Sequence, residues 1–164
     1  MRKKTTTSTY QPGQSIDSVM KKYGLRNVVK LASNENPYGP SPKSLAIAKK
    51  ISNTVNRYPD SKCYDLKYNL VAYINKPHIK LNNIIIGNGS NEILELLARL
   101  YLNDKSEVLF SKHSFLVYKI ISNAMHATIV ETKPKMSQGF GYMGTDLSEL
   151  NKKITKKTRM IFIA

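Results

Sequence analysis

The 164-residue sequence is poor in several residue types, and each scarcity excludes a class of protein. With one cysteine, Cys63, and three histidines, it cannot form an internal disulfide framework, and it offers no cysteine–histidine metal cluster. No apolar run reaches the roughly 18 residues that a membrane-spanning helix needs. The basic first residues are not followed by the apolar segment of a secretory signal, so we expect a cytoplasmic protein.

Acidic residues are also scarce. There are 26 lysines and arginines against 11 aspartates and glutamates, which gives a formal net charge of +15. A strongly basic chain can bind nucleic acid through its phosphates. However, nearly all of these residues are lysines spread along the whole sequence, whereas bidentate contacts to bases and phosphates favour arginine. We therefore interpret the charge as solvated surface and expect neither a nucleic-acid nor a membrane partner.

The hydrophobic pattern is that of a globular α/β protein. A hydrophobic content of 41% and this length suffice for a domain with a core. Helical periodicity predicts helices at about 16–23, 42–53, 64–74, 90–102, 114–124 and 146–153. Short apolar runs predict strands at 28–32, 84–86, 107–110, 128–132 and 158–164, and a glycine-broken loop over 139–144. Strands that alternate with helices favour a three-layer α/β/α fold with a mostly parallel sheet.

One stretch, residues 81–102, organises the rest. Its sequence LNNIIIGNGSNEILELLARLYL predicts a strand, a glycine turn and a helix. The first N–H groups of a helix have no partner within the helix, and the helix dipole is positive there, so such a turn can hold a phosphate. Ser90 and Asn91 would add side-chain donors. The same turn could also be a plain connection, because glycine and asparagine readily adopt positive φ.

Other polar and aromatic residues have two interpretations each. Residues 33–42, SNENPYGPSP, predict an ordered turn on the surface or over a cleft, or simply a linker to a helix that Ser41 caps. Tyr58 could bind a ligand or pack against a helix end. Tyr118 lies at helical spacing with other apolar residues, which is also typical of a core position.

Four spaced segments resemble motifs of one enzyme family. They are LASNENPYGPSP (31–42), NRYPD (56–60), IIIGNGSNEILELLAR (84–99) and SFLVY (114–118). Their order and spacing are similar to the N-terminal half of histidinol-phosphate aminotransferases, which are pyridoxal-phosphate enzymes of fold type I. The resemblance covers nearly all of the chain after residue 14. As a set, the four segments are far more specific than a glycine turn alone.

The resemblance also implies a domain organisation. Residues 1–15 would form a flexible arm, and residues 16–80 a helical segment that contributes to the small domain and to a dimer interface. Residues 81–164 would be the first part of the large domain, which binds pyridoxal 5'-phosphate. The last strand resembles the family strand that leads into an Asn-Pro-x-Asn-Pro-x-Gly segment. That segment does not occur in this sequence, so we expect a domain truncated before its end.

The resemblance assigns the cofactor phosphate to the glycine turn. Gly89, Ser90 and Asn91 match the turn whose backbone amides hold that phosphate in the family. Asn91 stands where many relatives carry aspartate. The asparagine removes a negative charge near the phosphate and keeps the backbone amide. Tyr58 matches a tyrosine that reaches across the dimer interface to the phosphate of the partner's cofactor.

Three further residues are assigned in the same way. Tyr118 matches the aromatic residue that stacks on the pyridine ring, a contact that a flat ring makes at little cost in entropy. Tyr38 and Asn36 lie in the segment that the family places near the substrate entrance, and we expect both to bind substrate.

The activity that the resemblance implies is transamination of histidinol phosphate. The family converts imidazole-acetol phosphate and glutamate into histidinol phosphate and 2-oxoglutarate, a step in histidine biosynthesis. Transamination needs a lysine that bonds the cofactor and an acidic partner for the pyridine nitrogen. The family carries both beyond the segment matched here, so we expect no catalytic residue in these 164 residues and no turnover by the chain alone.

Three alternatives remain at this point. The chain could belong to another aminotransferase of the same subgroup, one for aromatic amino acids, or to a phosphothreonine decarboxylase relative. It could instead be a non-catalytic basic binding protein that keeps the enzyme-like half as a scaffold. It could also be a fragment without an independent function, whose exposed sheet edges would favour aggregation.

Overall fold

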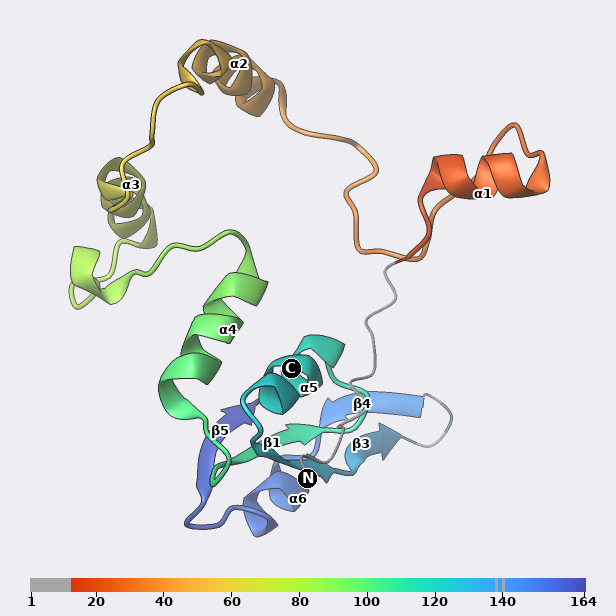
Figure 1. Cartoon of the computed structure of the whole chain (residues 1–164), viewed down its shortest axis with the longest axis vertical. Helices are drawn as coiled ribbons and strands as arrows, with labels where there is room; N and C mark the ends of the chain where they lie inside the picture. Colours follow the sequence, from red (N-terminus) through yellow and green to blue (C-terminus); the bar gives the residue numbers. More distant parts are fainter. Residues whose placement is uncertain (1–12, 138, 140) are drawn as a thin grey trace, which may run out of the picture. The chain divides into compact units, whose positions relative to one another are not determined.

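The computed structural model describes residues 13–137, 139 and 141–164. Most of the expected N-terminal arm, residues 1–12, therefore lies outside the described residues. Among the described residues, the chain divides into two compact units, and the boundary along the sequence lies between Ile84 and Ile85. Figure 1 labels the elements of both units.

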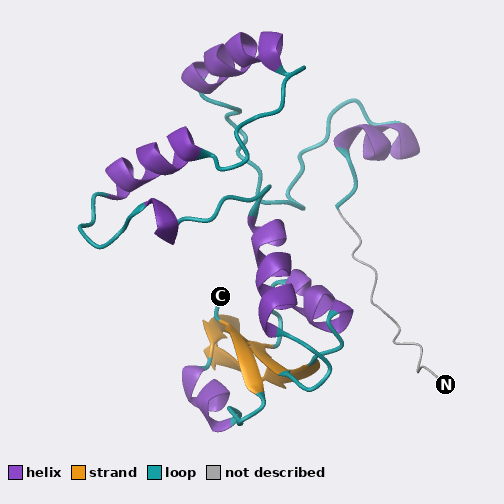
Figure 2. Ribbon diagram, turned by 60° about the vertical axis from the view of Figure 1, so that its left-hand side comes forward, coloured by secondary structure: helices purple, strands orange, loops and turns teal. Residues whose placement is uncertain are grey.

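The N-terminal unit consists of helices joined by loops (Figure 2). Its elements are α1 (Ile16–Tyr23), α2 (Pro42–Ile51), α3 (Tyr64–Ile74) and two short 3₁₀ helices, η1 (Ser52–Thr54) and η2 (Leu81–Asn83). The expected helix signals are confirmed, since Ser41 accepts a hydrogen bond from the Ser44 amide at the start of α2. Gly24 ends α1 in the left-handed conformation, with φ of 63°.

Two expectations for this unit are wrong. Residues 28–32 form no strand, because no neighbouring segment in the described part of the chain offers them a hydrogen-bonding ladder. The helical spacing of Leu45, Ala48 and either Ile47 or Ile51 also predicts an inward apolar face for α2. That face is missing, since Leu45, Ile47 and Ile51 are each more than half exposed. These apolar side chains have no second layer against them within the described residues of the unit.

The C-terminal unit is built on a parallel sheet of three strands in the order β2, β1, β5. The strands are β1 (Glu107–Ser111), β2 (Thr128–Thr132) and β5 (Thr158–Phe162), as the sequence predicts. Leu109 at the centre of β1 pairs with Val130 on one side and with Ile161 on the other. Four of the five residues of β1 are buried, which explains its continuous apolar sequence.

Helices cover this sheet on both sides (Figure 2). Two of them, α4 (Ser90–Tyr101) and α5 (Leu116–Ala124), pack on the face that carries Val108 and Phe110. The third, α6 (Leu147–Lys152), contacts β1 and begins at Asp146, whose carboxylate accepts hydrogen bonds from two amides of the first turn. The main core cluster comprises Ala98, Leu102, Val108, Phe110, Val117, Ile121 and Ala127. The predicted three-layer α/β/α arrangement is therefore present in this unit.

Two segments of this region differ from the prediction. Residues 84–86 belong to no strand, because they find no ladder partner among the described residues. Instead of a loop over 139–144, β3 (Pro134–Ser137) pairs with β4 (Gly141–Thr145) in an antiparallel manner. Gly141 and Gly144 have positive φ, and the hairpin accommodates them. Residue 140, within the expected loop, and residue 138, just before it, lie outside the described residues.

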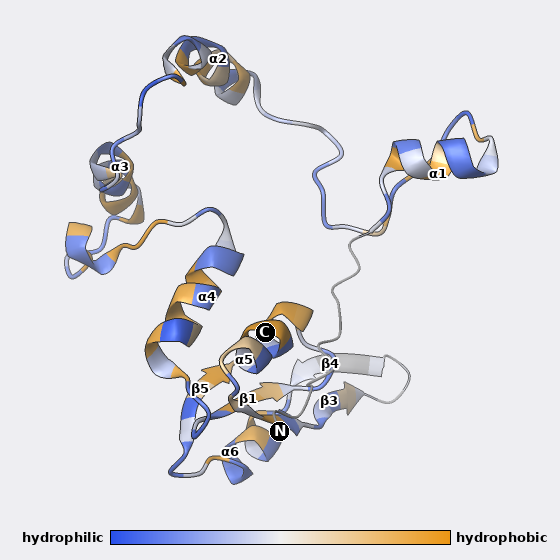
Figure 3. Cartoon of the chain, in the orientation of Figure 1, coloured by the Kyte–Doolittle hydropathy of each residue, from blue (hydrophilic) through white to orange (hydrophobic). Residues whose placement is uncertain are grey.

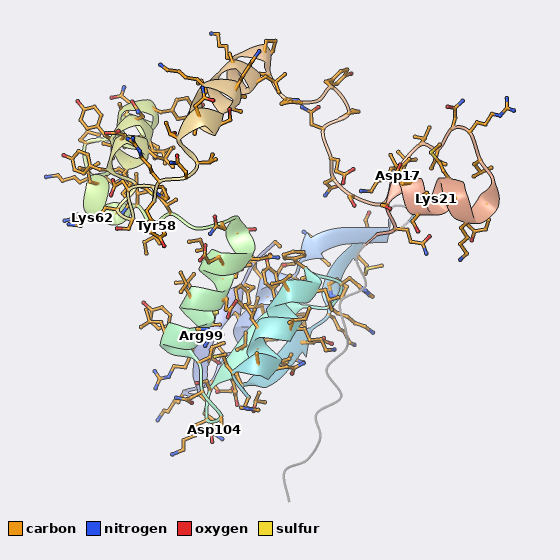
Figure 4. All side chains as sticks on the ribbon, turned by 45° about the horizontal axis from the view of Figure 1, so that its top comes forward. Asp17, Lys21, Tyr58, Lys62, Arg99 and Asp104 are labelled. Atoms are coloured by element: carbon orange, nitrogen blue, oxygen red, sulfur yellow. The ribbon has the colours of Figure 1, made fainter. Side chains whose placement is uncertain are left out.

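The surface of the C-terminal unit is not uniformly polar. Figure 3 shows hydrophobic colours on α4 as well as on the strands, and Leu96, Leu100 and Tyr101 of that helix are half exposed or more. On the same helix Arg99 and Glu95 form an exposed ion pair of 2.7 Å between Nη2 and Oε1, with Arg99 labelled in Figure 4. No helix in the described part of the chain is long and apolar enough to cross a membrane.

The core assignment predicts a difference between two identical substitutions. Ile121→Val removes a methylene from a side chain that is 7% exposed, and we expect it to lower the free energy of unfolding by about 0.5–1.5 kcal/mol. Ile85→Val makes the same change at a side chain that is 70% exposed, so its loss should stay below about 0.5 kcal/mol. Urea denaturation of both variants measures the difference, and equal losses would contradict this description of the core.

Candidate cofactor site

The glycine turn before α4 is closed by short local contacts. The Gly89 N–H donates to the Gly87 carbonyl at 2.9 Å, and the Asn88 N–H donates to the Glu92 carboxylate. A Cβ at Gly87 would lie 2.8 Å from Cδ1 of Ile93, so only glycine fits there without displacement. Gly89 has φ of 79° and ψ of 172°, a region that residues with a side chain rarely adopt. The backbone conformation therefore favours glycine at position 89, and a side chain at position 87 would have to displace that of Ile93.

The amino end of α4 offers unpaired donors. Gly89 is the N-cap and provides no side-chain cap. In the part of the chain that the structure describes, the backbone N–H groups of Ser90, Asn91 and Glu92 donate to no acceptor. All three residues are exposed. Three free amides at the positive end of a helix of twelve residues fit a phosphate group.

One feature of this end opposes an anion. The Glu92 carboxylate adds a negative charge to the first turn of α4, and like charges repel. That carboxylate accepts a hydrogen bond from the Asn88 N–H of the turn, and this bond fixes its position. The site therefore combines a rigid turn, three available donors and one fixed carboxylate.

The start of α5 lies beside this end of α4. Asn91 and Phe115 line a common pocket of about 280 Å³ together with Glu95, Val117, Ile120 and Ile121. Helix α5 follows the carboxyl end of β1, which is the edge of a parallel sheet where α/β proteins bind their ligands. The structure therefore brings Asn91 together with an aromatic ring of the loop after β1.

That ring is Phe115, a residue that the sequence analysis did not assign to the site. Phe115 is 45% exposed, whereas Tyr118 is half-buried against the core cluster. The Tyr118 ring lies parallel to Phe162, with a centroid distance of 4.2 Å and an angle of 1°. Helical spacing alone could not separate the two candidates, because residues three apart share a face. Their positions relative to α5 distinguish them, since Phe115 is the N-cap that precedes the helix, whereas Tyr118 lies in its first turn.

The remaining predicted site residues belong to the N-terminal unit. Asn36 forms a local turn, in which Oδ1 accepts from the Tyr38 N–H at 3.1 Å and Nδ2 donates to the Gly39 carbonyl at 3.0 Å. Tyr38 is 94% exposed, and Tyr58 is fully exposed on the loop before α3 (Figure 4). Their roles stay predictions. In the described part of the chain, no group of three or more acidic, histidine or cysteine side chains could hold a metal ion.

The fold is similar to that of solved aminotransferases. A histidinol-phosphate aminotransferase from Sinorhizobium meliloti, solved in complex with pyridoxal-5'-phosphate, matches with a TM-score of 0.75 and 19% identity. The match covers 90% of this chain and 38% of that one. The unit with the parallel sheet is therefore part of an α/β fold of the fold type I pyridoxal-phosphate enzymes.

The sequence comparison defines the family. The chain belongs to the family described as aminotransferase class I and II, whose model matches residues 26–164. Histidinol-phosphate aminotransferase 1 of Idiomarina loihiensis is 44% identical over 156 residues, and the histidinol-phosphate aminotransferase of an Anaeromyxobacter strain is 40% identical over 155 residues. Each match covers 94% of this chain and 40% of the relative. The chain thus spans about two fifths of the length of these relatives.

Asp60 fixes the loop that carries Tyr58. Its carboxylate accepts hydrogen bonds from the Tyr64 N–H at 2.8 Å and from the Lys62 N–H at 2.9 Å, which closes the loop onto the start of α3. These two bonds, and then the charges of Lys62 and Lys67, hold the pKa of the Asp60 carboxyl below its usual value.

This arrangement predicts an acid-sensitive loop. Because the folded pKa of Asp60 is lowered, its stabilising effect is complete above the unfolded pKa of about 3.9 and is lost as the pH falls through the folded pKa. The amide resonance of Tyr64 should therefore shift with a midpoint below that value. Asp60→Asn should abolish the transition, while Asp65→Asn, which changes the charge equally, should retain it. A Tyr64 resonance that titrates identically in all three proteins would refute the role of Asp60.

Proposed function

We propose that this chain is the cofactor-phosphate-binding portion of a histidinol-phosphate aminotransferase, which exchanges the amino group between glutamate and imidazole-acetol phosphate. The proposal is supported by relatives of that name at 40% and 44% identity over 94% of the chain. The observation that carries it is the glycine turn, which leaves the amides of Ser90, Asn91 and Glu92 free at the start of α4. An aromatic-amino-acid aminotransferase remains the nearest alternative.

The cofactor that fits this site is pyridoxal 5'-phosphate. The free amides of α4 and the Ser90 hydroxyl would donate to its phosphate, and the positive end of the helix dipole would favour the dianion. When bound, this cofactor withdraws electrons from the α-carbon of an amino-acid substrate. The contribution of these residues is to bind the phosphate and thereby to orient the ring.

An aromatic side chain from the start of α5 would cover the ring of the cofactor. The resemblance favours Tyr118 for this contact. The geometry favours Phe115, because that ring is more exposed and lines the pocket that contains Asn91. We therefore assign the contact to Phe115 within this proposal.

The N-terminal unit would complete the site in a dimer. The exposed Tyr58 is available for the phosphate of a partner's cofactor, and Asn36 holds the turn that presents Tyr38 to a substrate. In this proposal residues 16–80 contribute to the small domain and to the dimer interface, residues 81–164 contribute to the large domain, and the enzyme is cytoplasmic.

In this proposal no residue of the chain acts as the lysine that bonds the cofactor. We therefore expect the purified chain to show no transamination of histidinol phosphate with 2-oxoglutarate above the rate that free pyridoxal 5'-phosphate gives in buffer. The assay measures glutamate formation with and without the chain. Turnover that is saturable in histidinol phosphate and depends on the chain would contradict this assignment.

Binding of the cofactor phosphate is tested with pyridoxine 5'-phosphate. This probe keeps the ring and the phosphate but has an alcohol in place of the aldehyde, so it forms no covalent bond with the many lysines. Calorimetry should show binding of the probe and much weaker binding of pyridoxine, which lacks the phosphate. Equal affinity for both would refute the phosphate site.

Gly89→Ala should specifically weaken that binding. A side chain at φ of 79° strains the turn and turns the free amides away from a common anion, so we expect a loss of roughly ten-fold or more in affinity. Gly24→Ala is the matched control, because it also places alanine at positive φ, at the end of α1. It should destabilise the chain without changing the affinity. Equal affinities in the two variants would exclude the turn as the binding site.

A further inference from the structure

Four aromatic rings meet near the start of α5. Phe110 comes from β1, Phe162 from the end of β5, Phe115 from the N-cap of α5 and Tyr118 from the first turn of that helix. Tyr118 is at the centre of the group. Its ring lies parallel to Phe162 at 4.2 Å, is inclined to Phe110 at 6.1 Å and meets Phe115 edge-on at 5.7 Å and 90°. These are the geometries in which aromatic pairs attract each other.

The position of Tyr118 is fixed by ring contacts. Within the described part of the chain, its hydroxyl makes no hydrogen bond, so packing alone holds the side chain. Phe110 is 3% exposed on the central strand and is itself inclined to Phe162 at 6.5 Å. The Tyr118 ring is therefore held between rings of two adjacent strands and cannot rotate freely.

Phe115 has less support of its own. It is the N-cap of α5, with φ of −59° and ψ of 124°, and nearly half of the residue is exposed. An exposed side chain loses rotamer entropy when it is held in one orientation. Among the described residues, the Phe115 ring has one aromatic contact, the perpendicular one with Tyr118, and this contact restricts the rotation of the Phe115 side chain.

We propose that Tyr118 and Phe162 are positioning residues, which form a fixed aromatic platform that sets the orientation of Phe115 beside Asn91. Tyr118 then supports the ring contact with the cofactor from behind and does not make it. The inference rests on the proposed function, because it concerns the ring of the same cofactor.

The first test needs no cofactor. In the chain labelled at the phenylalanine rings, the Phe115 resonances can be identified by their loss in Phe115→Leu. Tyr118→Leu and Phe162→Leu should both shift the Phe115 resonances, whereas Tyr118→Phe, which keeps every ring contact, should leave them in place. Tyr101→Leu is the matched control, since Tyr101 is an exposed tyrosine of α4 with no ring contact among the described residues. Unchanged Phe115 resonances in Tyr118→Leu would overturn the proposal.

The second test uses the affinity for pyridoxine 5'-phosphate. Tyr118→Leu should weaken binding by roughly two- to ten-fold, which is the range of one aromatic contact. Tyr118→Phe, which keeps the ring, should bind the probe with the affinity of the wild-type chain. In a Phe115→Leu background, Tyr118→Leu should cause no further loss, because its effect passes through Phe115. A full additional loss would show that Tyr118 contacts the cofactor itself and would overturn the proposal. If the wild-type chain does not bind the probe, the proposed function fails, and the resonances alone decide whether Tyr118 orients Phe115.

Discussion

The structure of the C-terminal unit depends on the burial of β1. A strand taken out of water on both faces must pair its backbone groups on both edges, and β1 does so with parallel neighbours, β2 and β5. Parallel pairing places the carboxyl ends of the three strands at one edge of the sheet. Phe162 of β5 and the start of α5, which follows β1, therefore lie together at this edge, where the aromatic group forms.

The glycine turn depends on a different set of forces, which are local. Residues 84–86 have no ladder partner among the described residues, yet the turn is closed by the hydrogen bonds from the Gly89 N–H to the Gly87 carbonyl and from the Asn88 N–H to the Glu92 carboxylate. The residues that form these two bonds lie within six consecutive positions, 87–92. A phosphate site of this kind is preorganised by the first turn of one helix and does not need the strand before it to be paired.

Local rules explain what the sequence could predict. The starts of α2 and α6 follow from Ser41 and Asp146, since a cap is a contact between near neighbours. The strands β1, β2 and β5 could be predicted because each is a short run with several apolar or β-branched residues. The predictions of strands at 28–32 and 84–86 were wrong for the opposite reason. A strand exists only when a partner strand pairs with it, and the pattern of one segment does not reveal whether such a partner is present.

The candidate site shows the same division. The turn from Gly87 to Gly89 and the free amides after it follow directly from residue types in sequence. The choice between Phe115 and Tyr118 could not be made from the sequence. It depends on which of the two rings packs against Phe162 of β5, more than forty residues further along the chain. Family membership is shown by the match over residues 26–164, whereas the assignment of each residue to the cofactor is a proposal that only binding data can test.

The central claim is that the amino end of α4 binds the phosphate of the cofactor. Its most direct test is to titrate the ¹⁵N-labelled chain with pyridoxine 5'-phosphate and to follow each backbone amide. We predict saturable shifts that are largest at Ser90, Asn91 and Glu92, the three amides without an acceptor among the described residues. Shifts distributed over the lysine-rich surface, with these three amides unchanged, would contradict it.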